Sequence, residues 1–250
     1  MTSPSVHARA ARLETDQLRF EALQRMSYPE LQRLLTGDQS RAARWVRSAA
    51  ERGVAAAQLR LGRMLLDGTG VEPDATAAVH WFARAAELGD PDAHNMLGRC
   101  HEHGWGTPVD LPRAARCYAA AADLGSEWGE YNLGNMLFEG RGLARNGAEA
   151  FYWFGRAARR GHARAMNLLA RCLEEGWGCA RDLAEARIWY RRSAEAGYHR
   201  AQFNHALVLL ERGSPVEARS WLERAVGSAD ARLRRQIVRL LAAPGLAIMP

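Results

Sequence analysis

The run Cys100-His101-Glu102-His103 contains residue types that bind transition metals or transfer protons. The surrounding pattern predicts a helix, and side chains two positions apart on a helix point in different directions, so His101 and His103 do not converge on one ion. No second His or Cys cluster in the sequence has the spacing of a zinc site. We therefore predict neither a metal site nor a cofactor.

The basic residues restrict the possible enzymatic chemistry. All 34 of them are arginine, because the 250-residue sequence contains no lysine. Schiff-base, P-loop and Ser-x-x-Lys mechanisms each need an ammonium group, and arginine cannot replace lysine as a base because it stays protonated. The eight histidines are scattered, and no Ser, His and acidic residue form a recognisable set. We predict that the chain is not an enzyme; a hydrolase with no recognisable site is the alternative.

The N-terminal residues lack the apolar core of a signal peptide. No stretch approaches the ~18 consecutive apolar residues of a membrane span. We therefore expect a cytoplasmic protein whose four cysteines are reduced. A disulfide between Cys172 and Cys179 stays an open alternative.

A repeat of 36 residues organises most of the chain. Its clearest mark is an unbroken glycine series: Gly53, Gly89, Gly125, Gly161 and Gly197. Each unit predicts two helices, of which the first runs over residues 57–67 in the first unit. A Gly68-x-Gly70 turn ends that helix, since glycine adopts positive φ at low cost. Asp74 is the expected N-cap of the second helix, which turns Trp81 and Phe82 inward.

The repeated columns have a known counterpart. Ala-x-x-x-Leu-Gly, then Gly-x-Gly, then Asp-x-x-x-Ala-x-x-Trp-Phe-x-Arg-Ala-Ala-x-x-Gly, as they stand between Ala57 and Gly89, resemble the Sel-one-like repeat (SLR), a relative of the tetratricopeptide repeat (TPR). The resemblance implies an all-α fold, a right-handed α-solenoid of helix-turn-helix repeats with helical N- and C-terminal caps. It also implies a scaffold or adaptor for protein–protein interaction that binds a partner segment on its concave face.

The repeat divides the chain into eight segments. We expect an N-terminal helical extension (1–37), a half repeat (38–56), four full repeats (57–92, 93–128, 129–164 and 165–200), a shortened fifth repeat (201–230) and a C-terminal capping helix with a tail (231–250).

The net charge of +6 is concentrated at the two ends of the chain. Residues 1–56 hold nine Arg and six acidic residues, residues 57–198 hold 17 and 18, and residues 199–250 hold eight and four. A nucleic-acid-binding protein more often shows a continuous basic stripe. Binding of an anionic surface or a nucleic acid through the basic caps is therefore the second alternative function.

The resemblance to tetratricopeptide-like arrays implies that three columns of the first helices line the concave face. They lie one residue before each unit start, two after it and six after it. Arginine and asparagine recur in these columns. Arginine is suited to binding carboxylates and asparagine to binding a peptide backbone. Aromatic residues near the middle of the array are suited to an anchor side chain. The predicted partner-binding residues are Arg63, Asn95, Arg99, Trp128, Tyr131, Asn135, Arg164, Asn167 and Arg171. We expect the partner to be a protein or peptide with acidic groups. The alternative is that these arginines pair with nearby acids, among them Glu102, Glu139 and Glu174.

Overall fold

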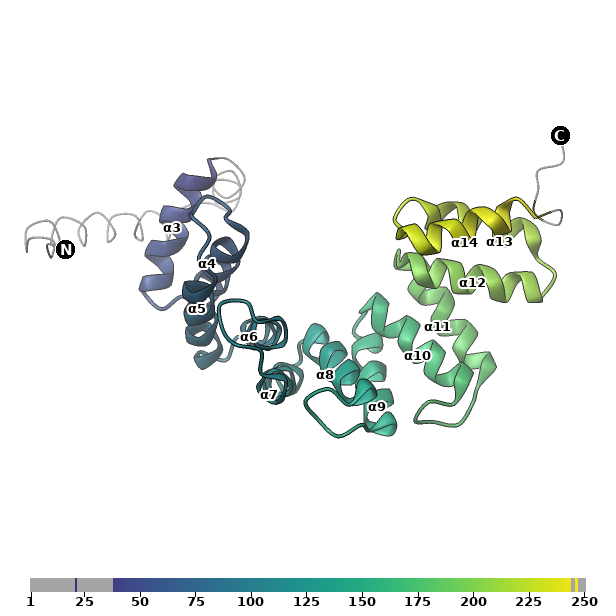
Figure 1. The fold of residues 1–250 in the computed structure, drawn as a ribbon, viewed down its shortest axis with the longest axis horizontal. Coiled ribbons are helices and arrows are strands. Elements are labelled where there is room, and N and C mark those ends of the chain that lie inside the picture. The colour runs from purple at the N-terminus through teal and green to yellow at the C-terminus, as the bar shows by residue number, and fades with distance from the viewer. Residues whose placement is uncertain (1–20, 22–37, 244–245, 247–250) are drawn as a thin grey trace, which may run out of the picture. The chain divides into compact units, whose positions relative to one another are not determined.

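The computed structural model describes residue 21, residues 38–243 and residue 246. Those residues form twelve helices and no strand (Figure 1). The helices are α3 (Gln39–Glu51), α4 (Ala55–Asp67), α5 (Ala75–Glu87), α6 (Pro91–His103), α7 (Leu111–Asp123), α8 (Glu127–Glu139), α9 (Gly147–Arg159), α10 (Ala163–Glu175), α11 (Leu183–Glu195), α12 (His199–Glu211), α13 (Pro215–Val226) and α14 (Ala231–Leu241). The predicted all-α repeat fold is confirmed, and the expected N-terminal extension over residues 1–37 lies outside the described part apart from residue 21.

The chain forms two compact units, Met1–Leu124 and Gly125–Pro250. Within each, the first helix of a repeat packs on its second helix, as α4 does on α5 and α10 on α11. Among the described helices, none is long and apolar enough to cross a membrane.

Helix boundaries follow from the capping residues of the repeat. The side chain of Asp74 accepts a hydrogen bond from the backbone N–H of Ala77 at 2.9 Å, as predicted for an N-cap, and Asp110, Asn146 and Asp182 cap the later second helices in the same way. The second glycine of the turns that end α4, α6 and α10 meets a different requirement. A Cβ on Gly106 would overlap the carbonyl oxygen of Ala75, at the start of the preceding second helix. The loop can therefore lie against that helix only if this residue is glycine.

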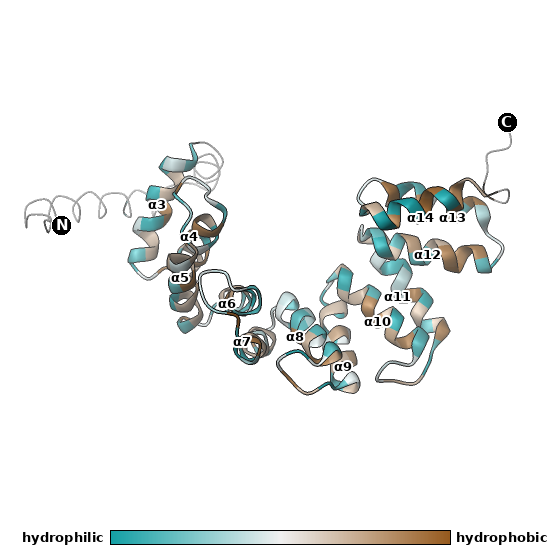
Figure 2. Ribbon diagram, viewed as in Figure 1, coloured by the Kyte–Doolittle hydropathy of each residue, from teal (hydrophilic) through white to brown (hydrophobic). Residues whose placement is uncertain are grey.

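The core places small residues opposite large rings. A Cβ on Gly134 would lie 2.7 Å from a ring carbon of Phe154, so the glycine lets α8 and α9 cross closely. The fully buried ring belongs to the residue that follows the repeated tryptophan. Phe82 and Phe154 are at most 1% exposed, whereas the preceding Trp81 and Trp153 are half-buried. Figure 2 shows that most helices carry both hydrophobic and hydrophilic residues, as a two-layer array requires.

The last described helix, α14, packs on α13. Its Leu233 and Ile237 are buried in one hydrophobic cluster with Leu222 and Ala225 of α13. Its arginines lie outside that cluster, which leaves them available at the surface.

Candidate functional site

The three predicted columns form one stripe on each first helix. With about 100° of rotation per residue, positions one before, two after and six after the unit start fall within roughly 60° of one another. We call this stripe the first-helix face. It comprises Ala56, Leu59 and Arg63 on α4; Asp92, Asn95 and Arg99 on α6; Trp128, Tyr131 and Asn135 on α8; Arg164, Asn167 and Arg171 on α10; and Arg200, Phe203 and Leu207 on α12.

In the first unit, the arginines of this face contact neighbouring side chains. The Arg63 guanidinium lies 3.5 Å from a carboxylate oxygen of Asp92, and both side chains are 48% exposed. Arg99 lies over the Trp105 ring, with its guanidinium carbon 4.9 Å from the ring centroid. Asn95 is buried, with only 7% of its surface exposed.

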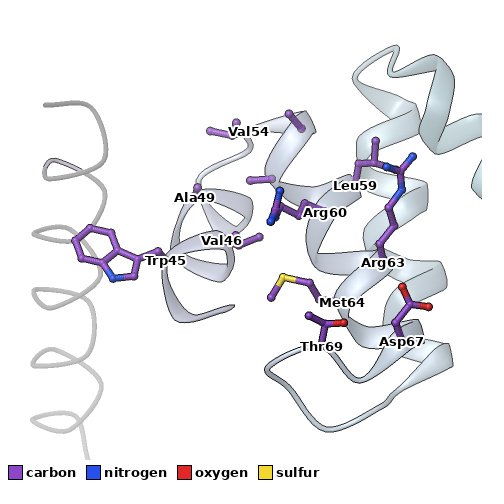
Figure 3. Close-up of a pocket in the computed structure, with 12 residues that line it drawn as sticks. Trp45, Val46, Ala49, Val54, Leu59, Arg60, Arg63, Met64, Asp67 and Thr69 are labelled. Carbon is purple, nitrogen blue, oxygen red and sulfur yellow. The ribbon is translucent and has the colours of Figure 1, made fainter. Parts of the chain in front are cut away.

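The first unit also has a mainly apolar pocket of about 590 Å³ between α3 and α4. Val46 and Met64 point toward one another across it, while Arg63 and Asp67 lie on its α4 side (Figure 3). Of the predicted residues, this pocket includes Arg63.

In the second unit, three rings form a cluster at the start of the face. The rings of Tyr131 and His162 stack with their centroids 4.5 Å apart, and the Trp128 ring meets His162 edge-on at 4.4 Å. Trp128 is nevertheless 42% exposed. In this cluster the His162 ring is therefore buried, whereas the Trp128 ring is accessible to a ligand.

His162 keeps a defined protonation state in this cluster. Its Nδ1 accepts a hydrogen bond from the backbone N–H of Ala165 at 3.1 Å, so the imidazole is the N-cap of α10. An acceptor nitrogen carries no proton, which places the proton of the neutral ring on Nε2. Burial, and to a smaller extent the nearby positive charge of Arg164, lower the pKa of His162 from 6.5 to about 4. The side chain is thus neutral at physiological pH.

Arginine side chains continue the face beyond the rings. The Arg164 guanidinium carbon lies 6.0 Å from the ring centroids of both Trp128 and Tyr198. Arg171 lies 4.7 Å from the centroid of Trp177, which itself contacts Phe138 of α8. Such cation–π contacts hold a guanidinium in place without neutralising its charge.

The asparagines differ in their surroundings. The amide of Asn135 donates to the carbonyl oxygen of Tyr131 on its own helix at 3.1 Å. Asn167 is 5% exposed and accepts a hydrogen bond at 2.9 Å from the amide of Asn204 on α12. The Asn167–Asn204 pair joins two first helices between the aromatic cluster and the next part of the face.

That next part is a polar pocket of about 590 Å³. Arg171 of α10, Arg200 of α12 and Arg232 of α14 line it together. Arg200 lies 2.9 Å from a carboxylate oxygen of Asp230. The backbone N–H of Leu233 and then Arg200 lower the pKa of Asp230, so this carboxylate is ionised. The structure thus brings the basic C-terminal cap and the predicted face into one site.

Arg232, Tyr198, Asn204 and His162 belong to this site but were not among the predicted residues. For Arg232 a signal was present in the sequence. The fifth unit is about four residues short, so the residue equivalent to Arg164 and Arg200 lies 32 rather than 36 positions after Arg200. That residue is Arg232, and the N-cap Asp230 falls in the column of His162 by the same count.

Three of the acids proposed as alternative partners of the arginines have other contacts. Glu102 accepts a hydrogen bond from the Tyr118 hydroxyl and Glu174 accepts one from the Tyr190 hydroxyl, both at 2.6 Å. Burial raises the pKa of Tyr190, and the hydrogen bond to Glu174 raises it further, so the tyrosine stays a donor. Glu139 pairs with Arg141 in the turn that follows α8.

All four cysteines are free thiols. Cys179 donates a hydrogen bond to the carbonyl oxygen of Cys172 at 3.3 Å, and burial raises the pKa of the Cys172 thiol to about 12. Within the described ranges, no group of three or more His, Cys, Asp or Glu side chains is placed to hold a metal ion.

Comparison with known proteins identifies the repeat. The model of the Sel1 repeat family matches six segments, residues 22–54, 55–90, 91–126, 129–162, 163–198 and 199–226. No protein with curated function matches the chain. Sel1 repeats generally mediate protein–protein interaction, and proteins built from them are typically non-enzymatic scaffolds.

Solved structures agree with this match. Protein c5321 of uropathogenic Escherichia coli, described as a protective antigen with an SLR fold, is 28% identical with a TM-score of 0.75, over 96% of this chain and 52% of that one. The chain thus spans about half the length of that protein. A Sel1 repeat protein from Oxalobacter formigenes is 29% identical with a TM-score of 0.68, over 74% of this chain and 76% of the other. Immunity protein Pa5087 of Pseudomonas aeruginosa shares the fold. It is 22% identical with a TM-score of 0.52, over 85% of this chain and 78% of the immunity protein.

Proposed function

The chain belongs to the Sel1 repeat family, and from this premise we propose that its first-helix face binds an extended or helical segment of a partner protein. The observation that carries the proposal is the order of side-chain types along this face in the second unit: aromatic rings, then amides, then arginines. Exposed Trp128 and half-buried Tyr131 precede the Asn167–Asn204 pair, which precedes a pocket lined by Arg171 and other arginines. One polypeptide segment can offer an apolar side chain, backbone amides and carboxylates in that order.

The aromatic cluster is suited to an apolar anchor. Trp128 is held edge-on by the buried His162 ring, so little conformational freedom is lost when a ligand covers it. Aromatic and arginine side chains also dominate the binding energy of many protein interfaces. Arg63, Asn95 and Arg99 provide the corresponding groups in the first unit.

Selection of peptides from a random display library against the full chain tests the proposal. We expect enriched peptides whose affinity, measured by fluorescence anisotropy, falls about tenfold or more in Trp128→Ala, equivalent to ~1.4 kcal/mol. Tyr152→Ala is the matched control, because Tyr152 is a 52% exposed aromatic residue on the second helix α9. Equal binding to the parent and the Trp128 variant, or no enrichment over a selection without protein, would refute the proposal.

A further inference from the structure

Three of the four arginines of α14 lie on the same face as Arg171 of α10 and Arg200 of α12. Helix α14 starts 32 residues after α12, and its N-cap Asp230 corresponds to Tyr198, the N-cap of α12. By this register, Arg232, Arg235 and Arg239 occupy the three columns of the first-helix face. Arg232 lines the pocket together with Arg171 and Arg200, and all three α14 residues are exposed.

We infer that this part of the surface docks an acidic segment of the partner protein, one that carries several clustered Asp or Glu side chains. The inference rests on the proposed function and names the chemistry of the segment that reaches the C-terminal part of the face. We call the surface the arginine ladder. It consists of Arg171, Arg200, Arg232, Arg235 and Arg239.

The charge of the ladder is only partly compensated. Asp230 pairs with Arg200, but among the described residues Arg171 and Arg232 form no ion pair. On α10 and α12 an acid stands one turn beyond the face, Glu175 and Glu211 respectively, whereas the equivalent residue after α14 is Ala243. The α14 part of the ladder therefore lacks an acid at that position, and several carboxylates can each meet a guanidinium there.

The other flank of α14 supplies an internal control. Arg234 is exposed like Arg232, but two positions of helix rotate it by about 200° to the opposite side of the buried Leu233. Its guanidinium donates to the carbonyl oxygen of Ala229 at 3.3 Å. Reversing the charge of either residue changes the net charge of the protein equally, so only position on the face distinguishes the two variants.

The test uses a fluorescein-labelled peptide with a run of glutamates next to one leucine, a counterpart in which glutamine replaces each glutamate, and a single-stranded oligonucleotide of equal charge. We expect the full chain to bind the glutamate peptide, to lose about tenfold or more in affinity in Arg232→Glu, and to lose less than about twofold in Arg234→Glu. The glutamine peptide should bind at least about tenfold more weakly to the parent protein.

Three results would overturn the inference. The first is an equal loss in Arg232→Glu and Arg234→Glu, which would indicate non-specific attraction. The second is oligonucleotide binding that is as tight as peptide binding and equally sensitive to Arg232→Glu, which would assign the ladder to nucleic acid. The third is a set of library-selected peptides that depend on Trp128 but not on Arg232; in that case the proposed function stands and the ladder inference fails.

Discussion

The side-chain amide of Asn204 donates a hydrogen bond to Oδ1 of Asn167 at 2.9 Å and thereby joins α12 to α10 on the first-helix face. Asn167 is almost fully buried, so an unpaired oxygen there would lose its hydration without compensation. The pair holds the helices that carry Arg171 and Arg200 in one register.

We predict that Asn204→Ala lowers the free energy of unfolding by about 1–2 kcal/mol, because it leaves Asn167 Oδ1 without its donor. The double-mutant cycle with Asn167→Ala should give a coupling energy of about 0.5–1.5 kcal/mol in urea unfolding followed by circular dichroism. Strictly additive effects would show that the bond contributes nothing to stability.

Gly134→Ala should destabilise the second unit by about 1–3 kcal/mol, because the new methyl group overlaps the buried Phe154 ring. Gly155→Ala is the matched control on the neighbouring helix. Its Cβ would make ordinary contact at 3.4 Å with the flexible end of Arg159, and alanine favours helix by up to ~1 kcal/mol. We expect thermal unfolding to shift downward for the first variant only; equal shifts would contradict the close crossing of α8 and α9.

Glu130→Gln tests the buried ion pair of the second unit. Glu130 is 0% exposed, and its Oε1 lies 3.0 Å from Arg156 and 3.3 Å from Arg160. Removing the charge should cost about 2–3 kcal/mol, since both guanidiniums lose their counter-charge. Glu139→Gln removes an exposed pair with Arg141 and should cost less than ~0.5 kcal/mol in the same denaturation assay. A smaller loss for Glu130→Gln than for Glu139→Gln would overturn this assignment.

His162 predicts a specific pH dependence of stability. Its pKa is 6.5 in the unfolded chain and about 4 in the folded one, so the unfolded state takes up the proton first as pH falls. Stability is therefore lost between about pH 6.5 and pH 4, by an amount on the order of 2–3 kcal/mol, and the dependence from this residue ends below about pH 4.

The control for that dependence is His162→Asn, which retains a side-chain acceptor for the N-cap of α10 but does not titrate. The difference in unfolding free energy between the parent and this variant should change across the stated range and be constant above pH 7. A difference that does not vary with pH would mean that His162 is protonated equally in both states.

The pattern of glycine, aspartate and tryptophan was sufficient to predict the repeat, its helices and the N-caps of its second helices. These features depend on local physics, namely backbone freedom at Gly68 and capping by Asp74, so they can be read from spacing alone. The choice of columns for the first-helix face came from the resemblance to tetratricopeptide-like arrays, and helical rotation explains only why those columns share a side.

Contacts between residues distant in sequence depended on the tertiary structure. The fold assigned Glu174 to Tyr190 rather than to an arginine, buried His162 as a neutral cap, and placed Arg232 of the last helix beside Arg171. The sequence by itself determined the helical array, the absence of lysine and the positive charge near the C-terminal end. Only the packing of α14 as one more first helix decided that this charge lies on the first-helix face, because burial of Leu233 and Ile237 orients the helix and so directs its arginines.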